Sequence, residues 1–167
     1  MLSRRKIRDE PFLHLDNGPI ILRFSNIMKL CSACLLGIDC RYDGGNNKNE
    51  KILRLLRRET LIPICPEQLG GLPTPRVPAE QREQRVVIEK GDDVTENFHK
   101  GAREALRLAR LYGVQEAILK QRSPSCGVGQ IYDGTFSGRV IAGNGVTAAL
   151  LQENGLKVIS EEGLFRP

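Results

Sequence analysis

Hydrophobic positions along the chain follow two patterns that alternate. Short, almost continuous apolar runs are typical of strands covered on both faces, and they occupy residues 28–36, 61–65, 116–120 and 156–160. Apolar residues at helical spacing separate these runs. They predict helices from a cap at Asn46 or Asn47 to about Glu59, from Thr95 to the closing Gly113, and from Val146 to Glu153.

This order of strand, helix, strand, helix, strand, helix and strand predicts parallel pairing with right-handed crossovers. We therefore expect an α/β fold: a single three-layer domain with a mainly parallel sheet of four strands, or slightly more, flanked by helices. Residues 28–163 would form this domain. Residues 1–27 show no clear period and read as an N-terminal extension: a dispensable tail, an added edge strand or a mis-assigned start.

Two segments between the main elements have weaker patterns. Residues 68–85 are proline-rich and carry Gly70-Gly71, so we expect an irregular loop of functional importance, followed by a small strand at Val86-Val87-Ile88. Residues 131–136 read as a small hairpin or excursion because they contain the turn pair Asp133-Gly134.

The composition narrows the functional classes. No apolar run approaches the length of a transmembrane helix and no signal peptide is visible, so we expect a cytoplasmic protein without a membrane partner. The net charge of +5 would favour small anionic ligands. A nucleic-acid partner is disfavoured, because only 5% of residues are aromatic and no Trp is present to provide a stacking platform. We expect a monomer or a homodimer.

Cysteine placement is the main chemical observation. Cys34, Cys65 and Cys126 each follow a separate apolar strand, and the carboxyl ends of parallel strands are where ligands bind in open α/β sheets. Thiolates are soft ligands that favour iron–sulfur clusters, zinc or copper(I), whereas a structural zinc site normally has four closed ligands. Three convergent thiolates on a cluster leave one iron open for substrate, which points to catalysis. The ordinary alternative is that these are buried core thiols.

The remaining two cysteines are expected to differ from these three. Cys31 and Cys34 would project to opposite faces of an extended strand, so Cys31 reads as a buried core residue. Cys40 is ambiguous, because it either lines the pocket or is inert.

Several polar residues lie close to the three cysteines in the sequence. Glu67, two residues after Cys65, is placed for acid–base work. Either Ser123 or Ser125 is placed to donate a hydrogen bond to a cofactor or substrate, although turn chemistry alone also explains them. Asp43 and Arg41 are expected on the pocket side. His14 and His99 are poor candidates for the site.

A series of motifs spans residues 28–161: Ser32-Ala33-Cys34-Leu35-Leu36-Gly37, Cys40-Arg41-Tyr42-Asp43-Gly44, Cys65-Pro66-Glu67, Gly70-Gly71-Leu72, Pro75-Arg76, Asp93-Val94-Thr95, Ser123-Pro124-Ser125-Cys126-Gly127 and Ile131-Tyr132-Asp133-Gly134. In this order and spacing the motifs resemble the thiouracil desulfidase family, long catalogued as a domain of unknown function.

The resemblance implies a [4Fe–4S] cluster on Cys34, Cys65 and Cys126 with one open iron. It further implies that 2-thiouracil or a related thioamide reacts with water to give uracil and sulfide without net redox change. Glu67 would be the acid–base residue and Ser123 would assist it. After handling in air, such a site is expected to be empty or to hold zinc.

Two other functions remain open at this point. One is a zinc- or cluster-bearing binding module without catalysis, with RNA as its candidate ligand. The other is a thiol-based sulfur carrier in which Cys40 is the mobile thiol. The first lacks support from paired Cys-x-x-Cys units. Release of sulfide from a small thiolated base would separate the enzyme from both alternatives.

Overall fold

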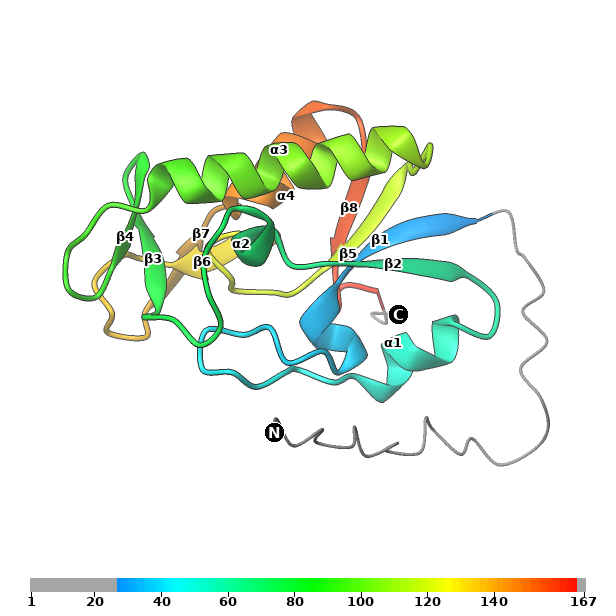
Figure 1. Cartoon of the computed structure of the whole chain (residues 1–167), viewed down its shortest axis with the longest axis horizontal. Helices are drawn as coiled ribbons and strands as arrows, with labels where there is room; N and C mark the ends of the chain where they lie inside the picture. Colours follow the sequence, from blue (N-terminus) through cyan, green and yellow to red (C-terminus); the bar gives the residue numbers. More distant parts are fainter. Residues whose placement is uncertain (1–26, 165–167) are drawn as a thin grey trace, which may run out of the picture.

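A computed structural model describes residues 27–164 of the chain. Its centre is a four-stranded sheet in the order β2-β1-β5-β8, and every neighbouring pair is parallel (Figure 1). The strands are β1 (Met28–Ser32), β2 (Thr60–Ile64), β5 (Glu116–Leu119) and β8 (Lys157–Ser160). The predicted α/β class and the parallel sheet are confirmed. The predicted N-terminal extension lies outside the described residues, except for Ile27.

Helices cover both faces of the sheet and make three layers (Figure 1). On one face lie α2 (Pro66–Leu69), α3 (Thr95–Leu111) and α4 (Val146–Glu153), and on the other lie α1 (Glu50–Leu55) and the 3₁₀ helix η1 (Ala33–Leu36). The alternation of side chains along each strand supplies both cores. Leu30 packs under α3 and α4, whereas its neighbour Cys31 packs toward α1.

The two long helices after the second strand begin and end as the sequence predicts. Asp93 accepts a hydrogen bond from the Thr95 N–H at 2.8 Å, where α3 begins. Gly113 has φ of +64° just beyond the end of that helix, a conformation that disfavours other residues. The predicted span of α4 is confirmed as Val146–Glu153.

The expected bounds of α1 are wrong at both ends. Its cap is Asn49, whose Oδ1 accepts hydrogen bonds from the N–H groups of Lys51 and Ile52. Asn46 and Asn47 have other partners: Asn46 bonds to Asp39 and to Lys48, and Asn47 bonds to Arg41. The helix ends at Leu55, and turns connect it to β2.

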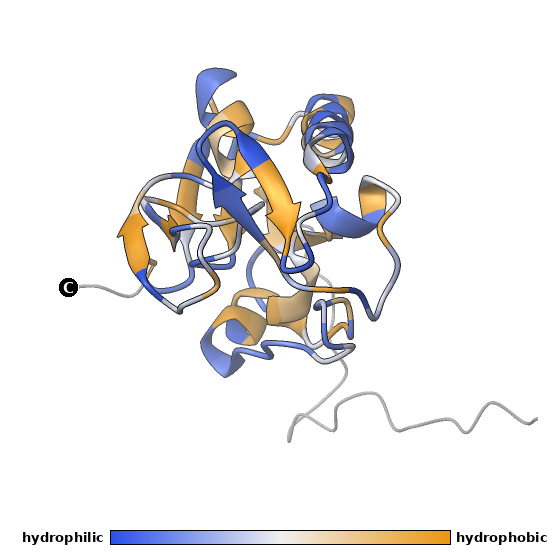
Figure 2. Cartoon of the chain, turned by 90° about the vertical axis from the view of Figure 1, so that its left-hand side faces the viewer, coloured by the Kyte–Doolittle hydropathy of each residue, from blue (hydrophilic) through white to orange (hydrophobic). Residues whose placement is uncertain are grey.

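Two antiparallel hairpins lie beyond the carboxyl ends of the sheet strands (Figures 1 and 2). The segment expected to be irregular begins within the last turn of α2 and contains β3 (Ala79–Arg82), which pairs with β4 (Arg85–Ile88). In Figure 2 the hydrophobic strand of this hairpin stands beside its polar partner. The predicted hairpin near residue 131 consists of β6 (Gln130–Tyr132) and β7 (Val140–Ala142).

Two glycines bring α2 against α3. A Cβ on Gly101 would lie 1.8 Å from the carbonyl oxygen of Pro66, and a Cβ on Gly70 would lie 2.0 Å from that of Asn97. The Asn97 side chain also donates to the Gly70 carbonyl at 3.0 Å. This contact places the short helix that follows Cys65. No helix in the described part of the chain is long and apolar enough to cross a membrane.

Candidate functional site

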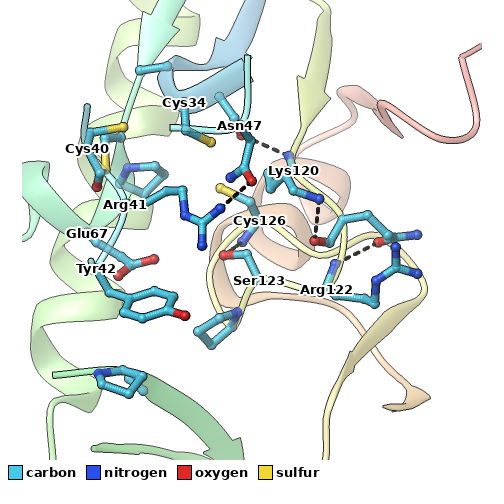
Figure 3. A pocket seen from close by; sticks show the side chains of 18 of the residues that line it. Cys34, Cys40, Arg41, Tyr42, Asn47, Glu67, Lys120, Arg122, Ser123 and Cys126 are labelled. Carbon is cyan, nitrogen blue, oxygen red and sulfur yellow. Dashed lines mark hydrogen bonds between the residues drawn. The ribbon is translucent and has the colours of Figure 1, made fainter. Parts of the chain in front are cut away.

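The three cysteines predicted to converge do line one cavity, of about 360 Å³. Figure 3 shows Cys34 and Cys126 in this cavity. Cys34 lies in η1 directly after β1, Cys65 lies between β2 and α2, and Cys126 lies in the loop after β5. Each therefore stands beyond the carboxyl end of a neighbouring parallel strand. The volume falls within the range typical of small-ligand sites.

Cys40 is the fourth thiol of this cavity, and it hydrogen-bonds to both Cys34 and Cys65. These bonds are the largest influence on the two neighbours: they lower the pKa of Cys34, and they lower the pKa of Cys65 to about 7. The same bonds raise the pKa of Cys40, because they favour its protonated form. Both shifts favour the thiolate, the form that binds metals.

Cys126 has a different environment. Burial raises the pKa of its thiol, while a hydrogen bond with Ser32 acts in the opposite direction. The Ser32 hydroxyl also accepts the Lys120 N–H at 2.9 Å, so the end of β1 is tied to the end of β5 beside this thiol.

Cys31 is a buried core residue, as the sequence predicts. It is fully buried in the core between the sheet and α1, and it does not line the cavity. Desolvation raises the pKa of its thiol to about 12, so Cys31 is a neutral core residue.

The donor set of the cavity indicates what kind of cofactor fits. Four thiols line it, Cys34, Cys40, Cys65 and Cys126. Thiolates are the soft ligands that hold iron–sulfur clusters. An iron–sulfur cluster therefore fits the donor set.

Glu67 lies in the first turn of α2, and its carboxylate faces the cavity (Figure 3). Its Oε2 accepts a hydrogen bond from Nε of Arg76 at 2.7 Å. The structure thus places Glu67 beside the thiols as the sequence predicts. It adds Arg76, to which sequence reasoning assigned no role because the residue lies in an irregular loop.

The two candidate serines have separate places. Ser123 lines the cavity, and its Oγ accepts hydrogen bonds from the N–H groups of Ser125 and Cys126, both at 3.1 Å. Its own O–H is left to donate into the cavity. Ser125 does not line the cavity, contrary to expectation: it is 1% exposed, and its hydroxyl pairs with that of Thr147 at 2.8 Å.

Arg41 lines the cavity as expected, and Asp43 does not. The Arg41 guanidinium donates to Asn47 at 2.7 Å and to Asp43 at 2.8 Å. The Gly45 N–H and Arg41 hold the pKa of Asp43 below its usual range. Asp43 was expected on the pocket side, but its carboxylate instead closes a turn with the Gly45 N–H and contacts the site only through Arg41.

The wall opposite Glu67 carries two cations that sequence reasoning missed. Lys120 pairs with the buried Glu161, and Arg122 pairs with Glu162 (Figure 3). The sequence signal that could have revealed them is a basic residue, Lys120, directly after the strand that leads to Cys126. The charge of Lys120 also contributes to lowering the pKa of Cys34.

Comparison with known proteins gives consistent matches. A family model described as 2-thiouracil desulfurase matches residues 30–163. An uncharacterized protein of Bacillus subtilis strain 168, YbbK, is 46% identical over 147 residues, which cover 82% of this chain and 97% of that protein. The solved structure of TudS, described as a [4Fe-4S]-dependent thiouracil desulfidase, is 46% identical with a TM-score of 0.76. That match covers 83% of this chain and 93% of the TudS chain.

Proposed function

Because this chain belongs to the 2-thiouracil desulfurase family, we propose that it removes the sulfur of a small thiolated base by hydrolysis. In the proposed reaction, 2-thiouracil and water give uracil and hydrogen sulfide, so the C=S bond is replaced by C=O without net redox change. The observation that carries this proposal is the cavity that Cys34, Cys65 and Cys126 share with Glu67 and Ser123.

The proposed cofactor is a [4Fe–4S] cluster held by Cys34, Cys65 and Cys126. The solved relative is described as dependent on such a cluster, and the donor set of this chain fits it. When bound, a cluster with three protein ligands supplies an iron with an open position that acts as a Lewis acid toward sulfur.

Proton movement is assigned to Glu67. Its carboxylate faces the cavity, where it would accept a proton from the attacking water and return one to the departing sulfur. The Ser123 hydroxyl would donate a hydrogen bond in the same space. Arg41, Tyr42 and Cys40 line the cavity around the position of the base and would orient it.

The test is anaerobic reconstitution with iron and sulfide, followed by measurement of iron content and of sulfide release from 2-thiouracil. Replacement of Cys34, Cys65 or Cys126 by Ala should abolish cluster binding and turnover. Cys31→Ala is the matched control, because that thiol lies in the core outside the cavity, and it should keep both. Normal iron loading and turnover by Cys126→Ala would refute the proposal, as would retention on RNA without any sulfide release.

The cellular location and oligomeric state of the enzyme are also part of the proposal. The structure pairs none of the five cysteines in a disulfide, and a reducing compartment keeps such thiols available, so we propose a cytoplasmic enzyme. We also propose that it acts on a small molecule as a monomer or a homodimer. Size-exclusion chromatography of the reconstituted protein measures its oligomeric state.

A further inference from the structure

Arg76 makes the most extensive set of contacts of any cation lining the cavity. It lies in the loop between α2 and β3, and its side chain is 7% exposed. Its Nε donates to Oε2 of Glu67 at 2.7 Å, and its Nη2 donates to the carbonyl oxygen of Cys40 at 3.0 Å. Its Nη1 donates to Oγ1 of Thr74 at 3.0 Å and to the carbonyl of Pro73 at 3.1 Å.

The bond to Glu67 is selective for one carboxylate oxygen. Oε2 is held by Arg76, whereas Oε1 takes part in no hydrogen bond among residues 27–164. The carboxylate faces the cavity (Figure 3). A planar guanidinium fixes the orientation of a carboxylate more tightly than a lysine ammonium does. Arg76 therefore leaves one oxygen of Glu67 directed at the space where the base would react.

The other end of the guanidinium is anchored beside the thiols. The Cys40 carbonyl oxygen that accepts from Arg76 lies 3.6 Å from the sulfur of Cys65. The main-chain N–H of Arg76 donates to the carbonyl of Tyr42 at 2.7 Å. One side chain thus ties the carboxylate of Glu67 to the segment that carries Cys40 and Tyr42.

We propose that Arg76 is a positioning residue for the desulfuration: it holds the Glu67 carboxylate in its reactive orientation relative to the thiol-lined part of the cavity. This inference rests on the proposed function, because it assumes the acid–base role of Glu67. Arg76 acts through Glu67 and does not itself react.

A double-mutant cycle on the reconstituted full-length protein tests this role. The variants are Arg76→Gln, Glu67→Gln and the two combined, with rates expressed per iron-loaded protein. Arg76→Gln should lower kcat about 10- to 100-fold, the scale expected for a misplaced catalytic group, with little change in KM. The double variant should be as slow as Glu67→Gln alone, because Arg76 has nothing left to position.

Two further variants complete the design. Arg76→Lys should recover part of the lost kcat. An ammonium reaches the Glu67 carboxylate, but it cannot contact the carboxylate and the Cys40 carbonyl at the same time. Arg103→Gln is the matched control and should be unchanged, because Arg103 pairs with Glu96 on the exposed face of α3.

The outcomes separate this inference from the proposed function. Unchanged kcat in Arg76→Gln, or losses that multiply in the double variant, would overturn the positioning role while leaving desulfuration intact. Full activity in Glu67→Gln would instead overturn the assigned chemistry of Glu67, and the inference with it. If Arg76→Gln takes up no iron, the cycle is run with Arg76→Lys in its place, and the same criteria decide.

Discussion

Replacement of Gly101 by alanine should destabilise the protein, although the usual rule gives the opposite sign. Gly101 lies in the interior of α3, where alanine normally improves helix stability by about 1 kcal/mol. Here the added Cβ would lie 1.8 Å from the carbonyl oxygen of Pro66, 2.7 Å from its carbonyl carbon and 3.2 Å from the Gly70 nitrogen. All three are backbone atoms, either of α2 or of Gly70 at its C-terminal cap, so the clash cannot be relieved by the movement of a side chain.

The magnitude follows from the distance that the two helices must open. A close carbon–oxygen contact is about 3.3 Å, so α2 and α3 would have to separate by roughly 1.5 Å at this point. Overpacking of this kind typically costs about 1–3 kcal/mol, and the upper part of this range exceeds the gain in helix propensity. Because only backbone atoms stand in the way, we take the upper part of this range, about 2–3 kcal/mol. After the gain of about 1 kcal/mol in helix propensity, we expect Gly101→Ala to lower the free energy of unfolding by about 1–2 kcal/mol.

Urea denaturation of the metal-free protein, followed by circular dichroism, measures this change. Gly163→Ala is the control: the nearest atom to its added Cβ is at 3.4 Å, an ordinary contact, so its effect should stay within about 0.5 kcal/mol. Because α2 also carries Glu67, Gly101→Ala should reduce sulfide release as well. A Gly101→Ala protein as stable as the parent would refute the close helix contact on which the reasoning depends.

Two further predictions concern charge and the serine loop. Burial alone would lower the pKa of Lys29, but its bonds to Glu59 and Glu116 outweigh this and raise it, while Lys29 in turn lowers the pKa of Glu116. The stability that Lys29 contributes is therefore fully present below its ordinary pKa of 10.5 and is lost as pH rises through its raised pKa in the folded protein. The stability that Glu116 contributes is present above its ordinary pKa of 4.5 and is lost as pH falls through its lowered pKa. Lys29→Met should cost about 1–3 kcal/mol near neutral pH, and this penalty should shrink toward pH 3 as Glu116 becomes protonated. Thermal unfolding across this range measures it, and a penalty independent of pH would contradict the ion-pair explanation. Ser125→Ala should lower stability by about 1–2 kcal/mol, because the buried Thr147 hydroxyl loses its partner, and should keep turnover per bound iron. Ser123→Ala should instead reduce that turnover, and the reverse pattern in paired denaturation and sulfide-release assays would show that the two serines have been assigned the wrong way round.

The amino-acid sequence by itself determined the class of fold and the place of the site. Apolar runs such as Leu61–Cys65 alternate with helical stripes, and only a parallel sheet with crossover helices buries both kinds of surface. Once the strands are parallel, their carboxyl ends meet at one edge. Residues that directly follow strands, such as Cys34 and Cys65, must then come together, so the convergence of the cysteines was predictable from local pattern alone.

Only the tertiary structure decided which neighbouring side chains face the cavity. Ser123 and Ser125 belong to one short loop, and the turn of the backbone directs the first to the cavity and the second to Thr147. The pairs Arg76–Glu67 and Lys120–Glu161 join segments whose approach depends on loop paths rather than on periodic pattern. Local propensity determines which elements form, whereas the packing of loops against them determines the partners of each charged group, and no short-range pattern in the sequence carries that information.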